Sequence, residues 1–71
     1  MSNQKKPKLT IYRAVMIAEG AEDPSYPEEY LEAWQYLIDT GHVWKLQGWF
    51  GRTASILISD GTCTMPTSET S

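Results

Sequence analysis

Few side chains of this chain have the chemistry that catalysis or metal binding requires. His42 is the only histidine and Cys63 the only cysteine, so a zinc site would hold one imidazole and one thiolate, which is too few. Glu28, Glu29 and Glu32 share one expected helix, but a small helical domain has no deep cleft that would raise a carboxyl pKa for acid–base work. We therefore expect no enzyme activity, no cofactor, no metal and no small-molecule substrate.

A second group of residues indicates binding instead of catalysis. The stretch LQGWFGR at 46–52 contains Trp49 and Arg52, and Trp and Arg are the residue types most enriched in interface hot spots. Trp44 and Tyr36 fall outside the apolar stripes of the helices expected around them, and Lys45 adjoins Trp44. Exposed together, these aromatic side chains would form an apolar patch of the kind that marks an interface. The sequence predicts a protein-binding surface at Tyr36, Trp44, Lys45, Trp49 and Arg52.

Two glycines inside this stretch need an explanation, because a glycine in a helix interior costs about 0.8–1.0 kcal/mol relative to alanine. Three interpretations stay open. The helix breaks, with a short helix over about 42–47 capped by Gly48 and another from about residue 50. Alternatively, the small residues Gly48, Gly51, Ala54 and Ser55 form a groove for a neighbouring helix. In the third interpretation, the glycines direct Trp49 and Arg52 outward.

Nucleic-acid binding is the main alternative function. A helix, a short glycine-containing turn and a second helix suggest a helix-turn-helix arrangement. The second helix would contact DNA with Lys45, Gln47, Arg52 and Thr53. Phosphate binding needs several cations, however, and the expected folded region adds only Arg13 to Lys45 and Arg52. We therefore favour a protein partner over nucleic acid.

Charge is unevenly distributed along this chain of net charge −3. Lys5, Lys6 and Lys8 lie near the N-terminus, whereas segment 19–39 has carboxylates and no lysine or arginine. Acidic side chains are favourable near a helix N-terminus, so this segment is either a solvated helix face or an acidic surface that docks on a basic partner. Its carboxylates are Glu19, Glu22, Asp23, Glu28, Glu29, Glu32 and Asp39.

The first element that would position these residues is a predicted helix over about 11–19. Thr10 is its expected N-cap, and Gly20 lies where a glycine commonly follows a helix. A strand is the rival, since LTIY and VMI are β-prone, but strict alternation is missing. The expected apolar stripe is Ile11, Tyr12, Val15 and Met16.

The second predicted helix follows the loop AEDPSYP and ends near Gly41. Ser25 and Glu28 have the spacing of a capping box, and Pro27 lies in the expected first turn, where its missing N–H costs nothing. The apolar face of this helix is predicted to consist of Tyr30, Leu31, Trp34, Leu37 and Ile38.

Helical spacing resumes directly after Gly41, with apolar residues at Val43, Leu46, Phe50, Ala54 and Leu57. Two helices joined by such a short turn form an αα-hairpin. Packing the first helix across this hairpin gives an all-α domain of three helices, or of four short ones. We expect one domain over 9–63, between a disordered basic tail at 1–8 and a disordered polar tail at 64–71.

No apolar run approaches the length of a membrane span, and no secretory signal is visible. The chain is therefore expected to be soluble, to act inside the cell and to have no membrane partner.

The run IDTGHVWKLQGWFGRTASILISDG at 38–61 resembles a signature found in a family of small proteins of tailed phages and prophages. In that signature an Asp-Thr-Gly run leads into Trp-x-Leu-Gln-Gly, an aromatic residue, Gly-Arg and a Leu-Ile-x-x-Gly ending. The resemblance covers 30–61 closely and 9–20 loosely, and it carries over no site residues. It implies a phage origin, a place in the host cytoplasm and, because small phage proteins often redirect host proteins, a host protein as the partner to be modulated or inhibited. Self-association is the other form that protein binding could take.

Overall fold

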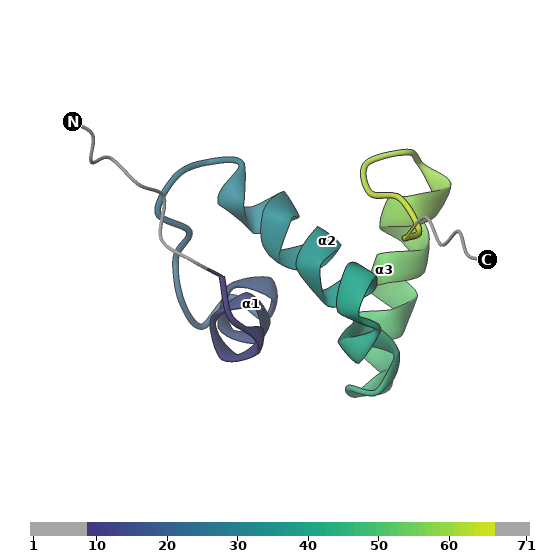
Figure 1. The fold of residues 1–71 in the computed structure, drawn as a ribbon, viewed down its shortest axis with the longest axis horizontal. Helices are drawn as coiled ribbons and strands as arrows, with labels where there is room; N and C mark the ends of the chain where they lie inside the picture. Colours follow the sequence, from purple (N-terminus) through teal and green to yellow (C-terminus); the bar gives the residue numbers. More distant parts are fainter. Residues whose placement is uncertain (1–8, 67–71) are drawn as a thin grey trace.

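The computed structural model describes residues 9–66, and the regular secondary structure of this region is helical, without a β-strand. Its elements are α1 (Ile11–Ala18), α2 (Glu29–Thr40), the single 3-10 turn η1 (His42–Trp44) and α3 (Gly48–Ser59). Helix α2 lies in the middle, with α1 on one side and α3 on the other (Figure 1). The predicted all-α, three-helix domain is therefore confirmed. The tail predicted at 1–8, and residues 67–71 of the tail predicted at 64–71, lie outside the described residues.

Helix α1 begins and ends as its sequence predicts. The Thr10 hydroxyl accepts a hydrogen bond from the Arg13 amide at 3.1 Å, which satisfies one of the free donors of the first turn. Gly20 follows the helix with φ 85°, a conformation that costs glycine little.

The predicted apolar stripe of α1 is wrong at Tyr12, whereas Val15 packs against the core as predicted. The buried residues are Ala14, Ile17 and Ala18, whereas Tyr12 is 70% exposed. Buried alanines on α1 and at Ala33 of α2 let the two helix backbones approach closely. The side chains of α1 that face the core most fully are therefore the two alanines and Ile17, and Tyr12 faces outward.

Helix α2 begins later than the capping-box spacing predicts. Pro27 lies in the turn before the helix, and Glu28 occupies the N-cap position without a side-chain cap. The Ser25 amide instead donates to Glu29 Oε1 at 2.6 Å, while the Ser25 hydroxyl accepts from Arg13 Nη2 at 3.0 Å. The start of α2 therefore depends on Arg13, a residue of another helix.

The connection between α2 and α3 breaks the helical register. Gly41 has φ 80° and ends α2, η1 follows, and Gln47 is an extended N-cap for α3 with ψ 153°. A short helical turn therefore does precede a second helix, as the break interpretation predicts, but the break lies before Gly48, and both glycines belong to α3. Ala54 is buried and Ser55 exposed, so the four small residues do not share one buried groove.

The core surrounds Trp34, which is fully buried. Helix α2 contributes the largest share through Ala33, Trp34, Leu37 and Ile38, and the other core residues are Ala14, Ile17, Ala18, Val43, Phe50, Ala54 and Cys63. The predicted apolar face of α2 is wrong at Tyr30 and Leu31, which are 41% and 38% exposed.

Beyond α3 the chain turns back onto α2. The Cys63 amide donates to the Leu57 carbonyl at 3.0 Å, and the Cys63 side chain is buried. The Gln35 side-chain amide donates to the Thr64 carbonyl at 2.7 Å and accepts from the Thr64 amide at 3.0 Å. Packed structure thus reaches Thr64, one residue past the predicted boundary at Cys63.

Candidate functional site

Trp44 is the most exposed tryptophan of the chain, and it rests on a glycine. Its side chain is 45% exposed. A Cβ built at Gly51 would lie 3.5 Å from Trp44 Cε3 and 3.8 Å from Cζ3. The glycine thus leaves an open backbone surface on α3 on which the indole ring lies.

Arg52 follows Gly51 directly on α3. A Cβ built at Gly48 would lie 3.2 Å from Arg52 Nη1, so the guanidinium group runs back along the first turn of α3. Residues three apart are neighbours on a helix surface, so Gly48 and Gly51 carry Arg52 and Trp44 side by side. The side chains that cover the two glycines are thus Arg52 and Trp44, and not those of a neighbouring helix.

Lys45 is exposed and follows Trp44 directly. We call Trp44, Lys45 and Arg52, with the two glycines beneath them, the Trp44 surface. Among residues 9–66 neither Lys45 nor Arg52 forms an ion pair; the ion pairs there belong to Arg13. The structure therefore places two of the five predicted binding residues, Trp44 and Arg52, on the glycines of α3, and a third, Lys45, is exposed and adjoins Trp44 in the chain.

The other two predicted binding residues lie at the edge of the core. Trp49 is half-buried, stacks on Phe50 with ring centroids 3.9 Å apart, and meets Trp34 edge-on at 6.3 Å. Its indole N–H donates to Gln47 Oε1 at 3.3 Å. Tyr36 is also half-buried and packs against the core. Both side chains have structural contacts, and their role in binding stays a prediction.

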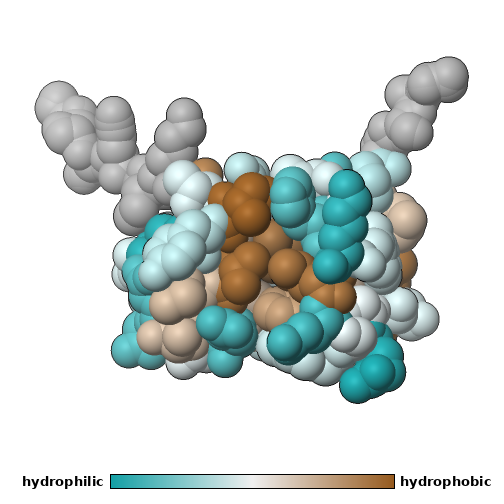
Figure 2. All heavy atoms as spheres, turned by 90° about the horizontal axis from the view of Figure 1, so that it is seen from below, coloured by the Kyte–Doolittle hydropathy of each residue, from teal (hydrophilic) through white to brown (hydrophobic). Residues whose placement is uncertain are grey.

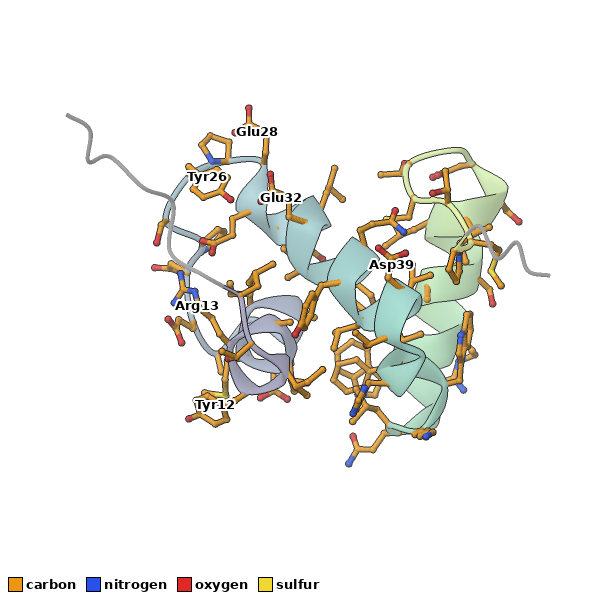
Figure 3. All side chains as sticks on the ribbon, viewed as in Figure 1. Tyr12, Arg13, Tyr26, Glu28, Glu32 and Asp39 are labelled. Carbon is orange, nitrogen blue, oxygen red and sulfur yellow. The ribbon has the colours of Figure 1, made fainter. Side chains whose placement is uncertain are left out.

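A second polar cluster, which sequence reasoning missed, joins α1 to the start of α2. We call Arg13, Glu22, Ser25 and Glu29 the Arg13 cluster. Arg13 donates from Nε to Glu29 Oε2 at 3.2 Å and from Nη2 to Glu29 Oε1 at 3.0 Å, and Nη1 pairs with Glu22. Figure 3 shows Arg13 extending from α1 toward the loop that precedes α2. The available signal was that Arg13 is the one cation between Leu9 and Thr40.

Glu29 is fully buried and can stay charged there because its hydrogen bonds are satisfied. The bond from Arg13 and then the bond from the Ser25 amide lower the pKa of the Glu29 carboxyl, against the opposing effect of burial. The same Arg13–Glu29 bond raises the pKa of Arg13. A buried ion pair with both oxygens engaged holds a fixed geometry, so this cluster fixes how α1 lies against α2.

Tyr26 and Glu32 form a neighbouring polar pair at the start of α2 (Figure 3). The Tyr26 hydroxyl donates to Glu32 Oε1. This hydrogen bond, with burial and nearby carboxylates, raises the pKa of Tyr26 to about 12.

His42 and Cys63 are the two residues considered for catalysis or metal binding. Neither belongs to the Arg13 cluster or to the pair of Tyr26 and Glu32. His42 Nδ1 is 3.3 Å from Thr40 Oγ1. Cys63 is 2% exposed, and burial raises the pKa of its thiol. In the described part of the chain no three His, Cys, Asp or Glu residues are placed to hold a metal ion, and no pocket is found. None of the described helices has the length and apolar composition of a membrane span.

The fold and the Trp44 surface define a small three-helix domain with an exposed aromatic and basic surface. The chain belongs to the family described as the domain of unknown function DUF7417, whose model matches residues 15–71. No curated protein and no solved structure matches the chain.

Proposed function

We propose that this protein acts by binding another protein through the Trp44 surface. The observation that carries the proposal is the seating of Trp44, which is 45% exposed and lies on Gly51 beside two cations without an ion pair among the described residues. Tryptophan and arginine are the side chains that contribute most to binding when a partner excludes water from them.

The composition of this surface suits a partner better than it suits the isolated domain. Each helical glycine costs conformational free energy, and a half-exposed indole ring leaves apolar area in water. Trp44 and Arg52 gain no ion pair within the described residues that would offset these costs. Contact with a partner would offset them by covering the ring and pairing the cations.

A further apolar area lies on the face that Figure 2 shows. Apolar side chains gather in a hollow at the middle of this face, between α1 and the η1–α3 turn, with hydrophilic side chains around it. Apolar patches with polar rims are typical of protein interfaces. This area could extend a contact that begins at Trp44.

The resemblance to phage and prophage proteins supports a more specific form of the proposal. In this form the chain is encoded by a phage or prophage, acts in the host cytoplasm and modulates a host protein. Nucleic-acid binding is the competing outcome, because Lys45 and Arg52 would also contact phosphate groups.

The test is affinity capture from a lysate of the bacterial host, with the full chain, Trp44→Ala and Tyr12→Ala as baits. Tyr12 is a matched control because it is an aromatic residue, 70% exposed, on α1. We expect a protein that the wild type and Tyr12→Ala retain and that Trp44→Ala loses, while circular dichroism shows all three folded. Equal capture by all three baits would contradict the proposed surface.

A nucleic-acid shift assay at two salt concentrations decides the alternative. Binding that weakens steeply with salt, together with the absence of a captured protein, would replace the proposal by the nucleic-acid function.

A further inference from the structure

Helix α3 buries few side chains within its own domain. It forms one edge of the fold, with α2 on its inner side (Figure 1), and only Phe50 and Ala54 of its twelve residues are buried. A helix at the surface of a soluble domain usually carries charged side chains on its outer face, but Arg52 is the one charged residue of α3. We call its exposed positions the outer face of α3: Gly48, Arg52, Ser55, Ile56, Ser59 and the C-cap Asp60.

Ile56 lies in the middle of the charged part of this face. It is 63% exposed and is the most exposed large aliphatic side chain among residues 9–66. Arg52 precedes it by four residues and Asp60 follows it by four, so the three side chains form one row along the helix. The Asp60 amide donates to the Ile56 carbonyl at 3.0 Å, so Asp60 keeps its helical position. An apolar side chain thus lies between a cation and a carboxylate.

This row is complementary to the same row of a second copy that runs in the opposite direction. A helix rises about 1.5 Å per residue, so Arg52 and Asp60 lie about 6 Å from Ile56 in opposite directions along α3. When the two Ile56 side chains meet in an antiparallel pair, Arg52 of each copy comes level with Asp60 of the other. The guanidinium group lies over Gly48, at the end of α3 that faces the negative C-terminal end of the second helix. With Ile56 on the two-fold axis, symmetry alone decides which carboxylate meets Arg52.

The other exposed large apolar residues of the described chain lack this arrangement. Three of them lie on α-helices, and no charged residue follows Tyr12, Tyr30 or Leu31 by three or four positions. An antiparallel pair centred on any of these three would gain no ion pair of this kind. Trp44 and Met65 lie outside the α-helices. The charge pattern therefore favours the outer face of α3 as the surface that a second copy contacts.

Both charges of the row are available to a second copy. Arg52 and Asp60 are exposed, and neither forms an ion pair among residues 9–66. Asp60 Oδ1 accepts a hydrogen bond from the Thr62 amide at 2.9 Å. Hydrogen bonds from the Thr62 side chain and then from its backbone lower the pKa of Asp60, so the carboxyl group stays ionised. A carboxylate has about four acceptor sites, which leaves room for a guanidinium group.

We propose that two copies of this chain associate through the outer faces of their α3 helices, antiparallel and with Ile56 on the two-fold axis. The two Ile56 side chains cover each other, and Arg52 of each copy pairs with Asp60 of the other. The remaining residues of the face are glycine and serine, whose small side chains let two helices approach closely. The inference goes beyond the proposed function, which depends on Trp44; the Arg52 side chain is common to both.

The test is sedimentation equilibrium of the full chain at concentrations up to about 1 mM. A single helix of about 18 Å buries less than the roughly 800 Å² per partner of a stable complex, so we expect a weak dimer with a dissociation constant of about 0.01–0.5 mM. Ile56→Glu brings two carboxylates together on the axis and should weaken the dimer at least about tenfold. The matched control is Tyr12→Glu, which introduces the same charge at a more exposed position and should dimerise as the wild type does. Circular dichroism verifies the fold of each variant.

The decisive measurement is a mixture of Ile56→Glu with Ile56→Lys. Each variant alone brings like charges together across the axis, whereas the mixed pair brings a carboxylate against an ammonium group. We expect the mixture to associate at least about tenfold more strongly than either variant alone, because position 56 contacts its own copy. A mixture of Tyr12→Glu with Tyr12→Lys should associate no more strongly than its two components.

The predicted ion pairs are tested by R52Q, D60N and the double variant R52Q/D60N. Each single substitution removes the same contacts, so each should weaken the dimer about threefold or more. The double variant should weaken it no further than one substitution does.

A wild type that stays monomeric at about 1 mM overturns the inference. So does a dimer of Ile56→Glu at wild-type strength, a mixture with Ile56→Lys that gains nothing, or a double variant whose effect is the product of the two single effects. These results leave the proposed function standing if the wild type still captures a host protein in a Trp44-dependent way. Conversely, a dimer with the expected charge dependence supports the inference even where no host protein is captured.

Discussion

Two helices are attached to the domain by different chemistry. Helix α1 is attached at its junction with α2, and α3 at its junction with η1. At the first junction, alanines bring the helices close and Arg13 pairs with the buried Glu29. At the second, the stacked rings of Trp49 and Phe50 pack against Trp34, and Trp44 and Arg52 lie on glycines at the outside.

This comparison shows how the chain distributes its few cations. Arg13 is engaged in structure, since both carboxylates that it pairs with belong to the same domain. Lys45 and Arg52 have no such partners among residues 9–66. Charges that hold the fold are satisfied internally, so the charges left over at the η1–α3 junction are the ones available for recognition.

The largest expected effect comes from Trp34, where the two junctions meet. Trp34→Ala should destabilise the domain by about 3–5 kcal/mol, a large share of the stability of so small a protein, and chemical denaturation monitored by circular dichroism will measure it. Trp34→Phe is the matched control. Within residues 9–66 the buried Trp34 indole N–H has no hydrogen-bond partner, so losing it should cost much less than losing the ring. An equal loss in both variants would show that the core does not tolerate the smaller phenyl ring.

The next largest effect concerns the α1–α2 junction. Glu29→Gln should destabilise the domain at neutral pH, because the buried carboxylate loses its charge and Arg13 loses its main partner. In contrast, Arg52→Gln at the other junction should leave stability nearly unchanged, since Arg52 is exposed. A comparable loss in both variants would remove the distinction between structural and available cations.

The pH dependence of this junction has a definite sign. The folded-state pKa of Glu29 is lowered, so the Arg13–Glu29 pair stabilises the fold at pH values above the unfolded pKa of about 4.3. This contribution is lost as the pH falls through the lowered folded-state value. Wild-type stability should therefore fall below about pH 5 more steeply than that of Glu29→Gln, as denaturation at a series of pH values will show. Parallel curves would mean that Glu29 titrates normally.

A smaller effect is expected at the turn that connects the two junctions. Gly41→Ala should destabilise the protein by about 1–2 kcal/mol, because φ at this position is 80° and a side chain is strained there even though the space is open. Thermal unfolding will measure the change. An unchanged melting temperature would mean that the end of α2 adjusts its backbone.

The smallest effect has the opposite sign. Gly51→Ala should stabilise the domain by about 0.5–1 kcal/mol through helix propensity, because its Cβ would make an ordinary contact with Trp44 at 3.5 Å. Denaturant titration will measure this gain. A loss of stability would contradict this prediction and show that the Trp44 ring needs the bare glycine.

Local sequence was sufficient to predict the bounds of α1 and the end of α2, but not the start of α2. Thr10 caps α1, and Gly20 and Gly41 follow α1 and α2 with positive φ. Each of these features is decided by backbone conformation and by hydrogen bonds within a few residues. They require no knowledge of what lies across the domain.

The tertiary structure decided which faces are buried and which charges are used. Periodicity predicted that Tyr12 and Leu31 would face the core, but the alanines of α1 and the position of α1 beside α2 leave both exposed. The predicted capping pair of Ser25 and Glu28 gave way to Ser25 and Glu29, because Arg13 of α1 reaches that loop.

By itself, therefore, the sequence determined an all-α chain of three helices and the positions of its turns. Whether Trp49 and Arg52 point inward or outward depended on contacts between distant segments: Trp49 stacks beside Trp34, and Arg52 lies outside on Gly48. The physical reason is that helix formation follows from local energies, whereas burial follows from the close packing of side chains that the linear pattern does not place together.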